Sequence, residues 1–276
     1  MSSRNIRLLI AYDGSPYAGW QVQPDKPTVQ QQIEQAIATV TQEHCRLACA
    51  GRTDTGVHAI GQVASFRTHS SIPIERFPLA IQSQLPESII IRSAKEVPED
   101  FHAGHSSLWK LYRYVILNDR HPRPHLRNFV TRVGDKLDVC AMDAAAQQLI
   151  GRHDFRSFES HYPNKATSVR TVHYCRVRRQ PEWTVVPGRQ PFSESAAAEP
   201  FVVLDIAADG FLYNMVRAIT GTLLQVGIGA WQPEQVAEIV QAQDRKLAGP
   251  TALPNGLYLM HVEYERPFSV EQAESL

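Results

Sequence analysis

The chain has 276 residues, of which 43% are hydrophobic and 20% are charged, and its formal net charge is zero. At this length and composition we do not expect a disordered chain, and the chain can form one large folded domain or two ordinary ones. No apolar run approaches the roughly 20 residues that span a bilayer, so we expect a cytoplasmic protein without a membrane segment.

The four cysteines are scattered and form no C-x-x-C pair: Cys45, Cys49, Cys140 and Cys175. This pattern is typical of reduced thiols. We therefore expect no structural disulfide and no metal.

The first hundred residues predict the order strand, helix, strand, strand, helix, strand. Residues 5–12 (NIRLLIAY) alternate in hydrophobicity and end at a turn. Thr28 is positioned to cap a helix with the apolar stripe Val29, Ile33, Ala36, Ile37 and Val40. Further strands are predicted at 46–49, 61–67 and 89–93, and a helix at 75–84. This order is that of a ferredoxin-like unit.

The second part of the chain also mixes strands and helices. Residues 109–117 (WKLYRYVIL) predict a strand with Tyr112 and Tyr114 on one face. A strand at 169–178 would carry Arg170, Arg176 and Arg178 on one side, as a basic face. The remaining predicted elements are helices at 138–150 and 211–226, a helix that opens at Pro233, and strands at 201–208 and 257–264.

Together these elements predict an α+β protein of two similar ferredoxin-like halves. The halves would form a mixed, mainly antiparallel sheet flanked by helices, with a central cleft. We place the N-terminal half at residues 1–104 and the C-terminal half at 105–276. Residues 180–200, rich in Pro, Gly, Ser and Ala, predict an irregular loop or hairpin.

Positive charge is concentrated in the middle of the chain. Residues 101–180 hold 14 Lys and Arg against 6 Asp and Glu. Most are arginine, whose planar guanidinium suits phosphate and stacked bases. Such a stretch is either a solvated surface or a nucleic-acid-binding face.

One loop combines residues that could carry chemistry. Residues 51–61 (GRTDTGVHAIG) bring together Arg52, Asp54 and glycines that permit tight backbone geometry near a ligand. From the pattern alone, Asp54 is a turn residue that caps its own backbone or a reactive carboxylate, and the first role is the commoner. His58 in the same segment is better explained as a packed or loop-stabilising residue than as a general acid.

The segment GRTDTGVHA resembles the GRTDxGVHA signature of the TruA family of tRNA pseudouridine synthases. Four other segments resemble the family in the same order: YDGSPYAGWQ at 12–21, DFHAGHSSLWKLYRY at 100–114, GRHDFRSF at 151–158 and FLYNMVRAITGTLLQVG at 211–227. The resemblance covers nearly the whole chain and is weakest at 180–200 and after about residue 266. Thr55 and Gly104 depart from the residues that family members often carry there.

The resemblance implies a role for each matching residue. Asp54 matches the essential aspartate, Tyr112 the active-site tyrosine, and Arg217 the arginine paired with the aspartate. Arg52 matches the arginine of the same loop and would bind substrate together with Tyr112. Whether Asp54 acts as nucleophile or as base stays open.

The resemblance also implies an activity. The family isomerises uridine to pseudouridine in the anticodon stem-loop of tRNA, at positions 38–40, with base flipping, no cofactor and a homodimeric enzyme. A non-catalytic tRNA-binding or chaperone protein is the main alternative. An aspartate-dependent hydrolase is a weaker one, because no P-loop or metal cluster accompanies the carboxylate.

Overall fold

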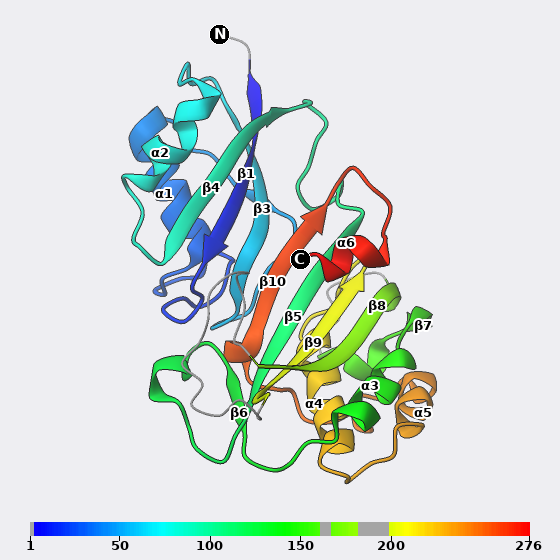
Figure 1. The fold of residues 1–276 in the computed structure, drawn as a ribbon. Coiled ribbons are helices and arrows are strands. Elements are labelled where there is room, and N and C mark those ends of the chain that lie inside the picture. Colours follow the sequence, from blue (N-terminus) through cyan, green and yellow to red (C-terminus); the bar gives the residue numbers. More distant parts are fainter. Residues whose placement is uncertain (1–2, 161–166, 182–198) are drawn as a thin grey trace. The chain divides into compact units, whose positions relative to one another are not determined.

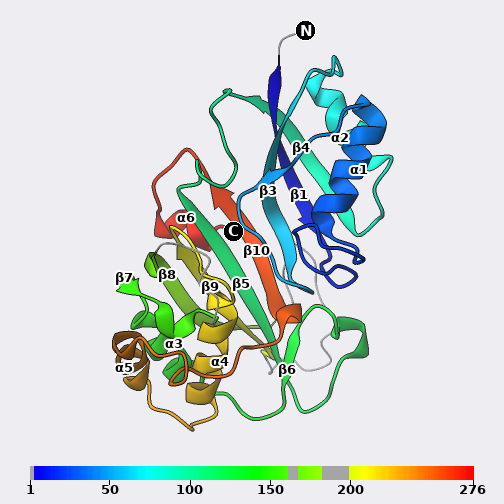
Figure 2. The same cartoon turned by 180° about the vertical axis from the view of Figure 1, so that it is seen from behind.

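The computed structural model describes residues 3–160, 167–181 and 199–276 (Figures 1 and 2). It has the α+β class that the sequence predicts. The chain divides into two compact units. Unit 1 comprises Met1–Leu108 and Tyr258–Pro267, and unit 2 comprises Trp109–Leu257 and Phe268–Leu276.

Unit 1 contains a mixed sheet in the order β4-β1-β3-β10, and β2 pairs with β3. β1 is antiparallel to both β3 and β4, whereas β10 runs parallel to β3. The first four strands and two helices follow the ferredoxin-like order β-α-β-β-α-β. The strands are β1 (Arg4–Tyr12), β2 (Ala48–Cys49), β3 (His58–Thr68), β4 (Ile89–Val97) and β10 (Leu257–Glu263).

The core of unit 1 lies between this sheet and its two helices. Alternate residues of β1, namely Ile6, Leu8 and Ile10, are fully buried, as the alternation predicts. α1 (Val29–Thr41) begins after Thr28, whose side chain accepts a hydrogen bond from the Gln31 amide, as predicted. The predicted helix at 75–84 is shorter: a 3-10 turn, η1 (Ile74–Arg76), precedes α2 (Phe77–Gln82).

Unit 2 contains an antiparallel sheet in the order β5-β9-β8-β7, and β6 runs parallel to β5. Its strands are β5 (Trp109–Asn118), β6 (Thr131–Val133), β7 (Gly151–Asp154), β8 (Val169–Gln180) and β9 (Phe201–Ala208). Its helices are α3 (Val139–Gln147), α4 (Met215–Gly227), α5 (Gln235–Ala242) and α6 (Val270–Glu274), with 3-10 turns η2 (Pro124–Leu126), η3 (Arg156–Phe158) and η4 (Pro254–Gly256).

The helices of unit 2 lie on both sides of its sheet. Figure 2 shows α3, α4 and α5 in front of the strands, whereas α6 lies in front of them in Figure 1. Just before α6, the ring of Phe268 packs against Trp109 and Tyr174. The short C-terminal segment therefore covers part of the sheet face opposite α3.

The predicted basic face of β8 does not form. The register shifts between Val172, which pairs with Ala208, and Tyr174, which pairs with Ala207. The extra residue, His173, reverses the alternation of side chains. Arg170 therefore faces the side opposite Arg176 and Arg178.

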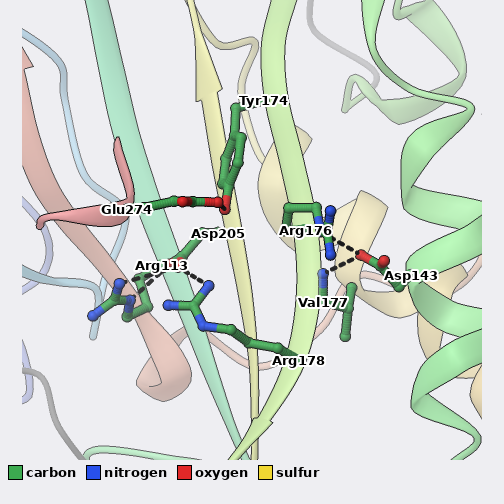
Figure 3. A network of polar contacts seen from close by, with 8 residues as sticks. All are labelled: Arg113, Asp143, Tyr174, Arg176, Val177, Arg178, Asp205 and Glu274. Atoms are coloured by element: carbon green, nitrogen blue, oxygen red, sulfur yellow. Dashed lines mark hydrogen bonds and ion pairs between the residues drawn. The ribbon is translucent and has the colours of Figure 1, made fainter. Parts of the chain in front are cut away.

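The basic side chains of β8 are also paired within unit 2 (Figure 3). Arg178 Nη1 lies 2.6 Å from Asp205 Oδ2, and Arg113 binds both carboxylate oxygens of Asp205, at 2.7 and 3.0 Å. Arg176 Nε lies 3.3 Å from Asp143 Oδ1 on α3. Part of the positive surplus of this region is thus balanced inside the sheet.

One other prediction changes at the C-terminal side. α4 begins at Met215 rather than at 211, because Asn214 adopts a left-handed conformation with φ of 61°. Of the predicted loop at 180–200, residues 182–198 lie outside the described part of the chain. None of the four cysteines, all of which are described, forms a disulfide. No helix among the described residues has the length and apolar character needed to cross a membrane.

Candidate active site

The Asp54 loop connects β2 to β3 in unit 1. The Val57 amide donates to the Asp54 carbonyl at 3.1 Å and closes a turn, in which Gly56 has a φ of +77°. Only glycine adopts this φ without strain. Within the loop, Arg52 is exposed and Asp54 is half-buried. Asp54 is therefore a turn residue through its backbone carbonyl.

Thr53, the residue before Asp54, is fixed from two sides. Its Oγ1 lies 2.7 Å from the Tyr12 hydroxyl, and its carbonyl accepts a hydrogen bond from the Trp20 amide at 3.0 Å. Tyr12 is buried, and burial raises the pKa of its hydroxyl well above the usual range. The hydroxyl is therefore neutral at physiological pH.

Two glycines of the segment YDGSPYAGWQ allow this segment to approach the loop. A Cβ at Gly19, whose φ is +96°, would lie 2.7 Å from the Thr53 carbonyl oxygen. A Cβ at Gly14 would lie 2.0 Å from the Val57 carbonyl oxygen. Both distances are too short for any side chain. The two sequence segments therefore form one packed structure, a relation that sequence order alone does not reveal.

His58 has the packed role that we predicted. It is buried, and its ring stacks on Tyr258 at a centroid distance of 4.7 Å. Its Nδ1 accepts a hydrogen bond from the Gly14 amide at 3.1 Å and lies 3.2 Å from Asp13 Oδ1. His58 thus links β3 to the turn after β1.

In unit 2, Tyr112 lies in the middle of β5. Its side chain is almost fully buried, and its ring meets Phe211 edge to face, with centroids 4.8 Å apart and planes at 77°. Such aromatic pairs fix the orientation of both rings. Phe211 was not singled out from the sequence, although it opens the segment that contains Arg217.

Arg217 lies in the first turn of α4 and is half-buried. Its Nε donates to the Ala252 carbonyl and its Nη1 donates to Asn214 Oδ1, both at 2.8 Å. Asn214 in turn donates to Ser160 Oγ at 2.8 Å. These bonds set the direction of the guanidinium.

Tyr114 supports the loop that holds Arg217. Its hydroxyl donates to the Leu253 carbonyl at 2.7 Å and lies 2.6 Å from Thr131 Oγ1. Burial raises the pKa of Tyr114 to about 12, so this hydroxyl stays protonated. Tyr114 therefore has a hydrogen-bonding role besides its packing in the core.

The predicted site residues thus belong to two sets. Arg52 and Asp54 share a loop in unit 1, whereas Tyr112 and Arg217 lie on β5 and α4 of unit 2. Each set is held by contacts within its own unit. The pairing of Asp54 with Arg217 stays a prediction.

Comparison with known proteins gives one family. The sequence profile of the family described as tRNA pseudouridine synthase matches residues 8–106 and 145–265. The chain is 41% identical to tRNA pseudouridine synthase A of Thermoanaerobacter sp. strain X514, over 95% of this chain and 100% of that protein.

Two other proteins of the same name are equally similar. That of Acetivibrio thermocellus is 43% identical over 95% of this chain and 100% of its own length. That of Pseudoalteromonas atlantica is 42% identical over 96% of this chain and 94% of its own. The chain therefore belongs to the tRNA pseudouridine synthase family and is an enzyme of the isomerase class.

Proposed function

We propose that this enzyme isomerises uridine to pseudouridine in the anticodon stem-loop of tRNA, at positions 38–40, with Asp54 as the essential carboxylate. The observation that carries the proposal is the position of Asp54 in a tightly held turn, within the family signature GRTDTGVHA. Fixed placement of the reacting group is what catalysis requires.

The reaction needs a carboxylate beside the sugar. The bond between N1 of uracil and C1′ breaks, the base turns, and a bond forms between C5 and C1′. C5 then loses a proton and N1 gains one, so the reaction balances without a cofactor. Asp54 would act either as a nucleophile at the sugar or as a base that takes a sugar proton.

Arg217 would pair with Asp54. An opposite charge nearby favours the ionised form of a carboxyl group and also sets its direction. The bonds from Arg217 to Ala252 and Asn214 support this role, because they orient the guanidinium before substrate arrives.

Tyr112 and Arg52 would bind the RNA. The edge-to-face contact with Phe211 holds the Tyr112 ring in one orientation, as a stacking partner for the target base requires. Arg52 is exposed on the loop and suits contact with a phosphate. Extruding a base from its helix costs a few kcal/mol, which such contacts would offset.

We further propose a cytoplasmic homodimer. The chain has zero net charge but a local surplus of Lys and Arg between residues 101 and 180. Two copies can align their positive regions into one surface that follows the RNA backbone. Light scattering should give twice the mass of the chain, and a monomer at micromolar concentration would contradict the dimer.

The central test replaces Asp54 with asparagine, which has nearly the same shape but cannot act as an anionic nucleophile or base. We expect Asp54→Asn to reduce pseudouridine formation by at least about 10³-fold, the scale seen when a catalytic carboxylate is removed. Binding of tRNA should survive. The product is mapped by carbodiimide modification of treated tRNA, followed by primer extension.

The matched control is Asp25→Asn, an exposed residue in a left-handed turn that asparagine also tolerates. It should leave the rate unchanged. A wild-type enzyme that binds tRNA without marking the anticodon arm would favour the non-catalytic alternative. Release of free uracil would favour a hydrolase. An Asp54→Asn variant with the wild-type rate would contradict the proposed chemistry.

A further inference from the structure

A chain of buried polar side chains lies beneath the Asp54 loop. Gln62 on β3 has no exposed surface, and Tyr12 on β1 and Thr53 in the loop are 5% and 7% exposed. Gln62 Nε2 donates to the Gly51 carbonyl at 2.7 Å and to the Tyr12 hydroxyl at 3.4 Å. The bonds therefore end on Gly51 and Thr53, on the N-terminal side of Asp54.

The direction of this chain follows from the available protons. The partners of the Tyr12 hydroxyl are Thr53 Oγ1 and Gln62 Nε2. The amide nitrogen of glutamine only donates, so the single proton of Tyr12 goes to Thr53. In this arrangement the donors follow the order Gln62 to Tyr12 to Thr53.

The backbone holds the same residue from another side. The Trp20 amide donates to the Thr53 carbonyl at 3.0 Å, where the missing Cβ of Gly19 makes room. The Ala50 amide donates to the Val63 carbonyl at 2.8 Å and fixes the start of the loop. Thr53 is thus held by both its side chain and its main chain, which restricts the backbone of Asp54.

We propose that Tyr12 and Gln62 are positioning residues that fix the carboxylate of Asp54 through Thr53 and Gly51. This inference rests on the proposed role of Asp54. Phenylalanine at position 12 would fill nearly the same volume as tyrosine but would place no hydroxyl in the core. A buried hydroxyl without a hydrogen-bond partner is unfavourable. A displacement of about 1 Å at a reacting group can reduce the rate about 10²-fold.

The test uses paired variants of Tyr12 and Thr53. Tyr12→Phe removes one hydroxyl, and Thr53→Val removes its partner at nearly constant shape. We expect either change to lower kcat roughly 10- to 100-fold, whereas KM for tRNA stays within about twofold, because the loop is loosened while the RNA contacts remain. Thr53→Ser keeps the hydroxyl and should retain most of kcat.

The double variant tests whether the two side chains act through one hydrogen bond. Tyr12→Phe combined with Thr53→Val should lower kcat no further than the more severe single change, since the bond is already lost. Independent, multiplying losses would show that the residues act separately and would overturn the proposal.

Tyr17→Phe is the matched control. Tyr17 is also buried, and its hydroxyl makes a bond of the same length, 2.7 Å, to Ser88 Oγ. Tyr12→Phe and Tyr17→Phe should both lower the melting temperature, but only Tyr12→Phe should lower kcat. Rates are measured at a temperature at which circular dichroism shows all variants folded.

Three further outcomes would overturn the positioning role: an unchanged kcat in both Tyr12→Phe and Thr53→Val, an equal loss in Tyr17→Phe, or no recovery in Thr53→Ser. Failure of the proposed function is distinct, because the wild-type enzyme would then form no pseudouridine. In that case Asp54→Asn would show no loss of rate relative to the wild-type enzyme.

Discussion

The two units bury different polar groups. Unit 1 buries neutral side chains such as Asn5, Gln30, Thr53 and Gln62, and among its described residues no Lys, Arg, Asp or Glu is buried. Unit 2 buries Lys110, Arg113, Glu159, Arg170 and Asp205. The described buried polar side chains of unit 1 are thus uncharged, whereas those of unit 2 include charged groups.

The contrast bears on the candidate site. A neutral support holds the Asp54 loop without placing a buried fixed charge beneath it. We propose that the charged partner of Asp54 is Arg217 of unit 2. In unit 2 the buried ions join neighbouring strands, since Asp205 of β9 lies between Arg113 of β5 and Arg178 of β8 (Figure 3).

Neutralising Asp205 should have the largest effect on stability. Asp205 is 1% exposed and Arg113 is 6% exposed, so Asp205→Asn leaves a buried cation without its counter-charge. We expect a loss of about 3–5 kcal/mol in the free energy of unfolding, measured by urea denaturation. Asp209→Asn, at an exposed residue that accepts the Thr171 amide, is the control and should change stability by less than about 0.5 kcal/mol. A loss under about 1 kcal/mol in Asp205→Asn would remove the contrast between the units.

The helix caps repeat the contrast on a smaller scale. Thr28 caps α1 with a buried hydroxyl, whereas Asp138 caps α3 with an exposed carboxylate that accepts the Ala141 amide at 2.9 Å. Each change to alanine should lose about 1 kcal/mol. Because salt screens the attraction of the carboxylate to the helix dipole, 1 M NaCl should reduce the effect of Asp138→Ala but not that of Thr28→Ala. Equal salt dependence in the two denaturation series would contradict the distinction.

Glu43 gives the smallest expected effect, and it depends on pH. The Thr68 hydroxyl at 2.7 Å, and then the His69 amide, donate to its carboxylate and lower its pKa. A lowered folded-state pKa means that the carboxylate stabilises the fold above the unfolded pKa, near about 4.3, and that this stability is lost as pH falls through the folded pKa. Glu43→Gln should therefore melt below wild type at pH 7, and the difference should shrink at pH 3. A constant difference between these pH values would show that ionisation of Glu43 plays no part.

Much of the fold could be predicted from the sequence, because local patterns dominate there. The alternation in residues 5–12 and the capped stripe after Thr28 each specify one element without help from distant residues. The bulge at His173 could not be predicted, because it exists only as a mismatch between β8 and β9. The late start of α4 depends on the left-handed conformation of Asn214. The spacing of apolar residues in the predicted helix at 211–226 does not predict this conformation.

The sequence by itself determined the family and marked Asp54, because the signature GRTDTGVHA and four further segments recur in one order. It did not determine what holds Asp54. Tyr12, Thr53 and Gln62 are up to 50 residues apart in the chain and meet only when β1 and β3 pair. Hydrogen bonds act over about 3 Å, so tertiary structure alone decides which distant groups make them.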